Sequence, residues 1–308
     1  MKHEWYHRIL ASKLSKGLFS AAFPHQVRIE TINSCNSKCS FCPMSVNSEE
    51  TKLRNVVKMD DDLFEKIIKE LHDENFEGDL KFYTQNEPLL DRRITDFVKR
   101  AKKAVPKVKR IQIDTNGLLL TEELGASLIE AGINHLHIND YSKDLSGNYN
   151  HKKEKIKNVA FKLIERFPTK KIIHRPRLIE EILDSRGGHA PNNRTTLASP
   201  IKVPCIYPSF QFPITSNGNV GLCCVDAIYE EPLGNVNNDT IKDIWNNNAY
   251  TQFRDELSKG QRVKKLCSQC TFSGHTRGLT YKVKGGYFNR LLYRFLSLPI
   301  KIILNMIK

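Results

Sequence analysis

From residue 26 to about residue 180, short apolar runs typical of strands alternate with longer segments of helical periodicity. Apolar residues at every second position predict a strand, and apolar residues spaced by three and four predict an amphipathic helix. By this rule we expect strands at residues 27–32, 80–84, 111–114, 135–139 and 171–178. Helices are expected at residues 60–74, 94–104, 121–132 and 151–166.

Five strand-then-helix units in series predict a parallel sheet, because parallel neighbours need a long, right-handed crossover. The expected fold class is therefore α/β, either a barrel or a doubly wound sheet. In both architectures the chemistry lies where the strands end, at the carboxyl edge of the sheet.

The pattern changes after residue 185, where Arg186-Gly-Gly188 and residues 191–200 are rich in turn-forming residues and predict a linker. Further on, Ser216-Asn-Gly-Asn219 separates two apolar runs and predicts a hairpin, because Asn-Gly accepts positive φ. Short helices are expected at residues 241–245 and 250–257. We therefore expect a second, smaller α+β domain.

Composition narrows the class of protein further. The chain has 308 residues, of which 40% are hydrophobic and 27% are charged, ordinary values for a globular protein. Its eight Cys fall in two groups, within residues 35–42 and 205–270, which indicates metal ligation in a reducing compartment instead of a disulfide scaffold. With no secretory signal and no run of 18 apolar residues, the expected location is cytoplasmic.

The net charge of +14 is concentrated at the two ends. Residues 1–28 contain five Lys or Arg and one Glu, and residues 277–308 contain seven Lys or Arg and no acid. A nucleic-acid groove requires basic residues along the fold itself, so this distribution argues against nucleic acid as a partner.

The candidate chemistry begins at Cys35, Cys39 and Cys42, directly after the first expected strand. Three thiolates at this spacing can hold three irons of a [4Fe–4S] cluster and leave the fourth iron open to a small molecule. Taken alone, the motif could also be a fragment of a zinc or redox site.

With Phe41 before the third Cys and Glu87-Pro-Leu89 closing the second strand, the chain resembles the radical S-adenosylmethionine (SAM) superfamily. The resemblance implies a partial (β/α)6 barrel over residues 26–190, after a basic segment of residues 1–25. It also implies a [4Fe–4S] cluster at the Cys triad and SAM as a cofactor. Reductive cleavage of SAM would give a 5′-deoxyadenosyl radical that abstracts a substrate hydrogen.

The same resemblance assigns cofactor-binding roles to four residues. Glu87 would accept hydrogen bonds from the SAM ammonium, although the two glycines that usually precede it are replaced by Gln85 and Asn86. Asn116 belongs to the Thr-Asn-Gly that closes the third strand, and Asn139 ends the fourth. Phe41 would shield the cluster and touch adenine. Outside the family context, Glu87 could be a surface acid, residues 115–117 an ordinary turn and Asn139 a structural residue.

The second Cys group resembles the SPASM domain in its shortened form, called twitch, expected at residues 191–276. This resemblance implies an auxiliary [4Fe–4S] cluster held by Cys205, Cys223, Cys267 and Cys270. Four Cys suit a zinc knuckle equally well, so zinc remains the alternative. Cys223 is preferred to Cys224 because neighbouring residues in a hairpin strand face opposite sides.

Two further features have open interpretations. Arg186, beside Gly187 and Gly188, could bind an anionic substrate group or assist deprotonation near the auxiliary cluster, or simply belong to a linker. Residues 287–308, within the basic tail of residues 277–308, form a basic amphipathic segment. It could lie on the inner membrane face or pack on the protein itself or on a second subunit.

These features together predict a radical SAM oxidoreductase that oxidises a small molecule such as a sugar or aminocyclitol. A glycan precursor is one possible substrate. The reducing partner of the enzyme would be a flavodoxin or ferredoxin. One alternative is a radical SAM enzyme that modifies peptides. The other is a zinc-binding module that contacts nucleic acid without catalysis.

Overall fold

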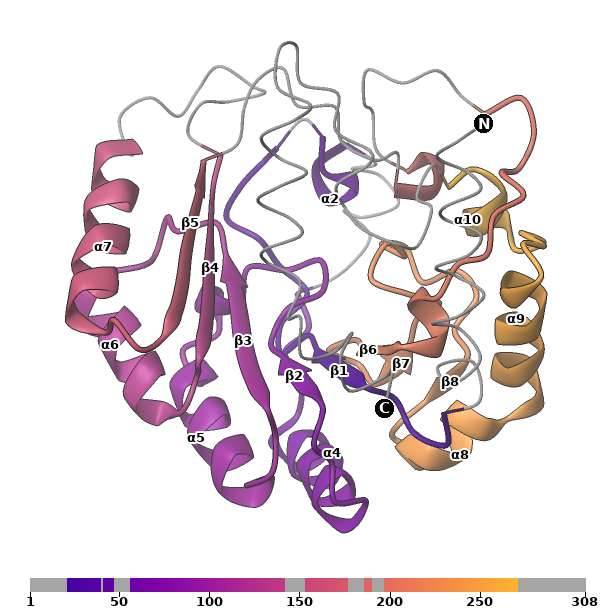
Figure 1. Ribbon diagram of the computed structural model, residues 1–308, viewed down its shortest axis with the longest axis horizontal. Coiled ribbons are helices and arrows are strands. Elements are labelled where there is room, and N and C mark those ends of the chain that lie inside the picture. The colour runs from indigo at the N-terminus through magenta and orange to yellow at the C-terminus, as the bar shows by residue number, and fades with distance from the viewer. Residues whose placement is uncertain are drawn as a thin grey trace, which may run out of the picture.

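The computed structural model describes residues 21–39, 41–46, 56–141, 153–176, 186–189 and 197–270, in which one eight-stranded sheet is the central element (Figure 1). The predicted tail segment, residues 287–308, lies outside these described residues. The strands follow the order β5-β4-β3-β2-β1-β6-β7-β8. Their bounds are β1 Gln26–Ile29, β2 Asp79–Lys81, β3 Arg110–Thr115, β4 His135–Asp140, β5 Lys171–Pro176, β6 Gln211–Ile214, β7 Asn219–Val220 and β8 Gly234–Asn235.

The helices begin and end close to the expected residues because the capping signals are local. Asp60 accepts a hydrogen bond from the Asp62 N–H, Thr121 caps the next predicted helix through the Leu124 N–H, and Gly132 ends it with φ of 132°. The helices are α2 Pro43–Val46, α4 Asp61–Asp73, α5 Ile94–Ala104, α6 Glu122–Ala131, α7 Lys153–Arg166, α8 Ile241–Asn246, α9 Asn248–Ser258 and α10 Lys265–Ser268. Single 3-10 turns occur at Pro88–Leu90, Arg186–Gly188 and Tyr207–Ser209.

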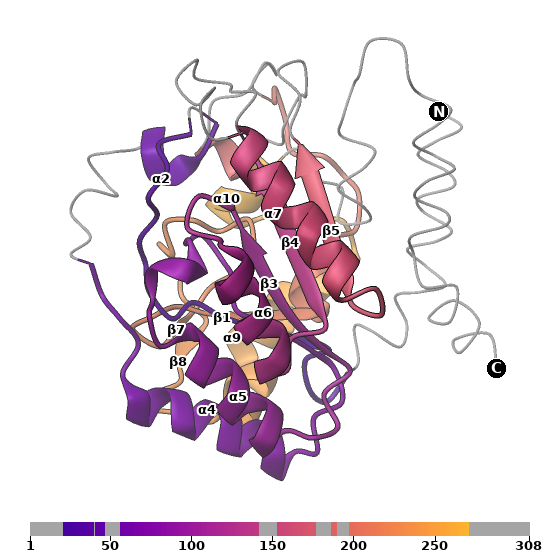
Figure 2. The ribbon, with the colours of Figure 1, turned by 90° about the vertical axis from the view of Figure 1, so that its left-hand side faces the viewer.

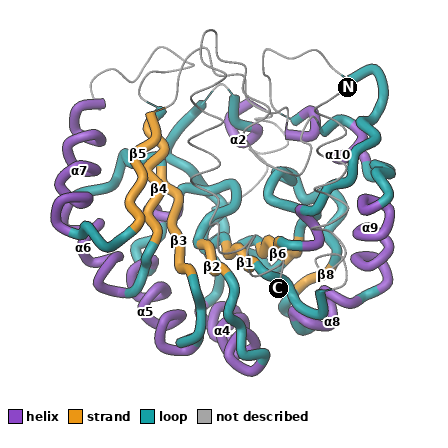
Figure 3. Tube along the Cα trace, in the orientation of Figure 1, coloured by secondary structure: helices purple, strands orange, loops and turns teal. Residues whose placement is uncertain are grey.

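The sheet has the architecture of an open barrel, and the predicted α/β class is confirmed. Strands β1 to β5 are parallel and adjacent in chain order. Helices α4 to α9 form an arc around the outside of the sheet, and the strands form one continuous band inside it (Figures 1 and 3). Seen from the side, α5, α6 and α7 lie in front of the strands (Figure 2). Helices on one face of consecutive parallel strands distinguish a barrel from a doubly wound sheet.

The predicted hairpin forms, and Gly218 adopts φ of 85° at its turn. The sequence did not indicate the partner of its first strand, β6. Strand β6 pairs in parallel with β1, with Val27 opposite Phe212 and Ile29 opposite Ile214. The segment that carries the second Cys group is thus continuous with the barrel sheet, while the predicted domain boundaries stay predictions.

Polar contacts between α4 and the start of α8 hold the two halves together on the outer side. Lys66 donates to the Val236 carbonyl at 2.6 Å, and Glu70 accepts from the Ile241 N–H at 2.8 Å. Beneath α4, the rings of Phe64 and Phe97 stack with centroids 4.2 Å apart, and both side chains are fully buried. The core therefore lies between the helices and the outer face of the sheet.

Replacing Phe64 with Ala should lower the free energy of unfolding by about 3–5 kcal/mol, because a buried aromatic side chain leaves a cavity that its neighbours fill only in part. Phe161→Ala is the control, since Phe161 on α7 is 54% exposed and its loss should cost far less. Urea unfolding followed by far-UV circular dichroism, under anaerobic conditions, measures both. Equal losses would contradict this assignment of the core.

Candidate active site

The predicted Cys triad lies in the loop that follows β1, at the carboxyl edge of the barrel. The Cys35 side chain reaches solvent, while Cys39 and Cys42 are half-buried. The Cys42 N–H donates to the Cys39 carbonyl at 3.0 Å, and the Ser37 N–H donates to Cys35 Sγ at 3.4 Å. The protein around Cys35 is dense enough for burial to raise the pKa of its thiol to about 11. A bound cation would favour the thiolate that burial disfavours.

Glu87 lies where the family resemblance places it, at the carboxyl edge beyond β2, and it is almost fully buried. Its Oε1 accepts from Thr115 Oγ1 at 2.7 Å and from the Leu89 N–H at 3.1 Å, and its Oε2 accepts from the Asn116 N–H at 2.7 Å. Burial raises the pKa of the Glu87 carboxyl to about 7, against the opposing effect of these three donors. A carboxylate has about four acceptor positions, so Oε2 can still accept from a ligand ammonium.

Asn116 connects the end of β3 to the Cys loop. Its Nδ2 lies 3.7 Å from Cys35 Sγ and donates to Asn36 Oδ1 at 2.8 Å, and its Oδ1 accepts from the Leu118 N–H. The structure thus brings Glu87, Asn116 and Cys35 together. The side-chain amide of Asn116 thus holds the Cys loop in position.

Phe41 and Asn139 are placed at the same edge from the far side of the barrel. The Phe41 ring packs on Tyr141, the residue after β4, with centroids 5.1 Å apart. Asn139 lies within β4, opposite Arg175 of β5, and is 9% exposed. The end of β4 therefore borders the third Cys through the Phe41–Tyr141 contact.

The second Cys group forms a buried cluster at the ends of separate segments. Cys205 donates its N–H to the Leu257 carbonyl at 3.1 Å, and the Cys270 N–H donates to the Cys267 carbonyl at 3.2 Å as α10 ends. Burial raises the pKa of the Cys205, Cys223 and Cys267 thiols. For Cys223, the neighbouring sulfurs of Cys224, Cys267, Cys205 and Cys270 add to that effect, so all five thiols share one electrostatic environment.

The reason given above for preferring Cys223 to Cys224 does not hold in the structure. Strand β7 ends at Val220, and both Cys lie in the turn beyond it, where strand alternation no longer applies. Both are buried, and Cys224 contributes to the raised pKa of the Cys205 thiol. Its backbone carbonyl is engaged by Gln85 Nε2 at 2.7 Å. The choice of Cys223 stays a prediction, now resting on its proximity to all three partners.

Arg186 lies beside the loop after β2 and the second Cys group. Its Nη1 donates to Gln85 Oε1 at 3.4 Å, and Gln85 in turn reaches Cys224. The 3-10 turn that contains Arg186 packs on α10, where a Cβ on Gly187 would meet Leu266 Cδ1 at 2.2 Å. Gly187 also has φ of 66°, so only a residue without a side chain fits this close approach.

Two residues of this edge were missed at the sequence level. Gln85, noted only as a replacement for glycine, bridges Arg186 to the turn of the second Cys group. Glu30, at the end of β1 and almost fully buried, accepts from Thr84 Oγ1 in a short hydrogen bond. The signal that could have found Gln85 is the pair of amide side chains in positions where the family carries glycine.

The donor sets fit iron–sulfur clusters in their chemistry. Buried thiols that raise one another's pKa resist ionisation until positive metal ions stabilise the thiolates, and the irons of a cluster would supply that positive charge. Within the described ranges, no three His, Cys, Asp or Glu side chains lie close enough to share one metal ion. In a cubane each thiolate binds a different iron, so its ligands need not converge on a single point.

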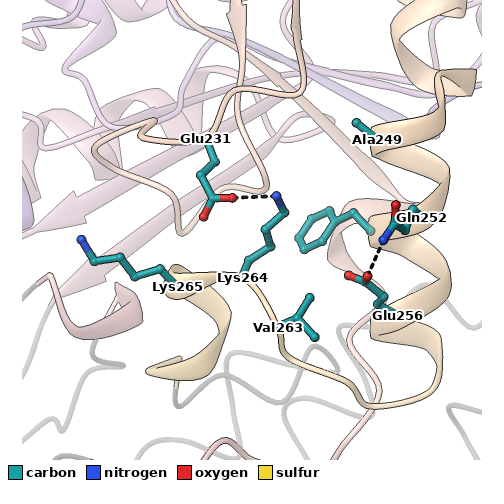
Figure 4. A pocket seen from close by; sticks show the side chains of 8 residues that line it. Glu231, Ala249, Gln252, Glu256, Val263, Lys264 and Lys265 are labelled. Carbon is teal, nitrogen blue, oxygen red and sulfur yellow. Dashed lines mark hydrogen bonds and ion pairs between the residues drawn. The ribbon is translucent and has the colours of Figure 1, made fainter.

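A surface pocket lies outside both Cys groups, between α9 and the residues that lead into α10 (Figure 4). Lys264 and Glu231 meet at its mouth at 2.6 Å, and Gln252 donates to Glu256 at 2.9 Å. Its charged side chains thus already have partners, Lys265 pairing with Glu230 at 3.2 Å, and none of the predicted cofactor residues lines the pocket. In the part of the chain that the structure describes, no helix is long and apolar enough to cross a membrane.

Comparison with known sequence families gives two matches. The profile of the radical SAM superfamily matches residues 29–174, and that of the SPASM iron–sulfur cluster-binding domain matches residues 205–271. A curated relative from Niallia circulans, the S-adenosyl-L-methionine-dependent 2-deoxy-scyllo-inosamine dehydrogenase, is 30% identical over 245 residues. The match covers 79% of this chain and 91% of the relative.

Two solved structures extend the similarity to three dimensions. The crystal structure of BtrN with AdoMet and 2-DOIA matches with a TM-score of 0.69 at 28% identity, over 81% of this chain and 94% of that chain. A structure of anSMEcpe with bound AdoMet matches with a TM-score of 0.52 at 14% identity, over 92% of this chain and 98% of that chain, and supports the fold alone.

Thr115→Val should lower the free energy of unfolding by about 1–3 kcal/mol, because it removes a hydroxyl donor from a buried carboxylate. Thr31→Val provides a matched control: the buried Thr31 hydroxyl has no hydrogen-bond partner among the described residues, so its loss should be neutral or stabilising. Thermal unfolding of both variants measures the difference. Loss of stability in Thr31→Val alone would contradict the role given to the Glu87 hydrogen bonds.

Proposed function

This chain belongs to the radical SAM superfamily and is an oxidoreductase of that family, and we propose that it oxidises a hydroxyl of a small, sugar-like molecule to a ketone. The observation that carries the proposal is the extent of the similarity to a dehydrogenase that acts on an aminocyclitol. It spans 91% of that relative, and the two matching family profiles together include both Cys groups of this chain. The contacts from Arg186 through Gln85 to Cys224 support it, because they connect the loop that carries Glu87 to the turn of the second Cys group.

We assign the cofactor contacts as follows. Cys35, Cys39 and Cys42 bind the SAM-binding [4Fe–4S] cluster, and the free acceptor position of Glu87 Oε2 receives the SAM ammonium. Phe41, packed on Tyr141, covers the cluster from the side of β4. Asn116 and Asn139 border the same volume from the ends of β3 and β4. When bound, the cofactors supply the acceptor for a substrate hydrogen atom.

Oxidation of an alcohol to a ketone removes a hydrogen atom from carbon, a proton from the hydroxyl and one electron. Arg186 cannot serve as a base because a guanidinium stays protonated in proteins. It can donate hydrogen bonds to the substrate oxygen and favour its ionisation, with the proton passing to water. Its contact with Gln85 sets its position beside the loop after β2 and the second Cys group.

The second Cys group, Cys205, Cys223, Cys267 and Cys270, is proposed to hold the cluster that accepts the remaining electron. Arg262 supports this assignment. It is 5% exposed and donates from Nη2 to the Val203 carbonyl at 3.2 Å, and its charge opposes the burial that raises the pKa of the Cys205 and Cys267 thiols. A buried cation near the cluster also favours its reduced form, since net charge is one determinant of cluster potential.

The partners follow from this chemistry. A flavodoxin or ferredoxin is proposed as the external electron donor, in a cytoplasmic setting that keeps thiols reduced. The basic amphipathic pattern of residues 287–308 supports contact with an anionic membrane surface, as a peripheral protein on the inner face. Such contact would suit a substrate that is a glycan precursor.

The direct experiment is a screen of deuterated sugars and cyclitols for transfer of deuterium into 5′-deoxyadenosine, with the anaerobically reconstituted full-length protein and dithionite. Transfer from a carbon that becomes a ketone is the expected result. Stimulation by a peptide and not by any sugar would point instead to a peptide-modifying enzyme. A colourless protein that holds only zinc would overturn the proposal altogether.

Cys39→Ala should abolish 5′-deoxyadenosine formation from SAM, because two thiolates cannot retain the SAM-binding cluster. Cys270→Ala, in the other Cys group, should keep measurable cleavage of SAM while losing substrate oxidation. Chromatographic quantification of 5′-deoxyadenosine separates the two effects. Equal loss of cleavage in both variants would contradict the division of roles.

Cys223→Ala should lower the iron content by about four atoms per chain, the content of one cubane. Cys224→Ala should leave it unchanged, because Cys224 is assigned no iron. Iron analysis together with electron paramagnetic resonance of the reduced proteins measures this. The reverse pattern would make Cys224 the ligand.

A further inference from the structure

The inner face of the barrel sheet, the face turned away from the helices, is polar from strand to strand. Side chains alternate between the two faces of a strand, and Val27, Leu80, Ile111 and Leu136 belong to the core on the helix side. Their neighbours in sequence must therefore point inward. The inward residues are Gln26, Arg28, Asp79, Lys81, Arg110, Gln112, Asp114, His135, His137 and Gln211.

Strand register aligns four basic residues and one amide in a row across this face. Arg28 lies opposite Lys81, Lys81 opposite Gln112, Gln112 opposite His135, and His135 opposite Lys171. We call these five residues the basic row. No acid belongs to it. Burial lowers the pKa of His135 to about 3, and Lys171 is exposed to solvent, so the uncompensated charge of the row lies at Arg28 and Lys81.

The acids nearest the row already have other partners. Asp79 pairs with Arg110 at 3.2 Å, and Asp114 pairs with His137 at 3.2 Å. Asp114 also accepts from Gln112 Nε2 at 2.5 Å. Arg28 and Lys81 thus have no ion pair with an acid among the described residues.

Arg28 and Lys81 carry the clearest signs of a missing ligand. Arg28 is 5% exposed, its Nε donates to Gln26 Oε1 at 2.9 Å, and its Nη1 has no partner in the described structure. Burial and then the Arg28 charge lower the pKa of Lys81 to about 7. Two cations that repel each other on an enclosed face are the arrangement that an anion would stabilise.

Unpartnered polar atoms lie on the same face. The buried Oε1 atoms of Gln112 and Gln211, which are acceptors, lack partners in the described part of the chain, and so does the Nε2 of His137. Hydroxyl groups could donate to the amide oxygens. A ligand that satisfies the whole inner face therefore combines an anionic group with several hydroxyls.

We propose that the end of the basic row formed by Arg28 and Lys81 binds a phosphate or carboxylate of the substrate, which is thus an anionic sugar derivative. The proposal rests on the function proposed above and specifies its substrate class. Gln112 of the row lies four residues before Asn116, about 13 Å along β3 at 3.3 Å per residue. A substrate that reaches from the row to the cofactor edge is therefore elongated. A neutral or amino-substituted single ring would leave both cations without a counter-charge.

Isothermal titration of the reconstituted protein tests this without turnover, with glucose 6-phosphate, glucuronate, glucose, 2-deoxystreptamine and inorganic phosphate as probes. At pH 7 we expect the two anionic sugars to bind at least tenfold more tightly than glucose or the aminocyclitol. Lys81→Met should remove most of that preference. Lys69→Met, which changes an exposed lysine on the outer helix α4, should leave it unchanged.

The pH dependence adds a readout that a purely structural role would not move. Lys81 faces Arg28, Arg110, Asp79 and Asp114, and its own pKa of about 7 lies in the range in which affinity is measured. Affinity for glucuronate, whose charge is constant in this range, should fall between pH 6.5 and pH 9 as Lys81 loses its proton. The same titration with Lys81→Met should be flat.

Raising the pH should stabilise the folded protein, although it weakens anion binding. Because the pKa of Lys81 is lowered on folding, the free protein should become more stable between pH 7 and about pH 10.5, where only the unfolded state carries this proton. Lys81→Met should therefore fold at least as well as the parent protein at pH 6.5. Thermal unfolding confirms that any lost affinity does not come from a lost fold.

Four results would overturn the proposal. Equal affinity for glucose and for the anionic sugars is one, and unchanged affinity in Lys81→Met is another. Inorganic phosphate that binds as tightly as glucose 6-phosphate would exclude a sugar from the site. Oxidation of an aminocyclitol with a KM unaffected by Lys81→Met would refute the anionic substrate class but leave the proposed dehydrogenase activity standing. Tight binding of anionic sugars without any oxidation would support the anionic binding site and refute the dehydrogenase activity.

Discussion

The buried carboxylate of Glu87 is the point on which the arrangement of the active edge depends. It accepts hydrogen bonds from Leu89, Thr115 and Asn116, while its own N–H donates to the Ser34 carbonyl. One side chain thus fixes the ends of three segments that arise from separate strands. Asn116 extends the network to the Cys loop. The loop that would hold the catalytic cluster is positioned by hydrogen bonds, with little apolar packing of its own.

Much of this architecture could be predicted from the sequence because its determinants are local. The helix from Asp61 to Asp73 and the helix that ends at Gly132 are specified by caps and periodicity within a few residues. The pairing of β6 with β1 has no local signature, since Gln26 and Gln211 meet only in the folded chain. The turn at Cys223 was misjudged for a related reason: β7 ends early, and strand length depends on partners rather than on the apolar run.

The candidate site shows the same division between local and tertiary information. The Cys triad, Glu87 and Asn116 could be assigned from spacing and family resemblance, and the structure brings them together. Gln85 could not be assigned, because its role consists of contacts with Arg186 and Cys224, each about a hundred or more residues away in the chain. The basic row could not be predicted either, because the sequence does not show which polar residues of separate strands lie opposite one another. Only the strand register places them side by side.

The direct pairing of β6 with β1 has a consequence for how the chain can be divided. Shortening the protein before residue 205 would remove β6 and leave Gln26–Ile29 of β1 as an open sheet border with unpaired N–H and carbonyl groups. Such borders recruit strands from other molecules and promote aggregation. The segment that carries the second Cys group therefore also protects the first strand, and a barrel expressed without it should be insoluble whatever its cofactor content.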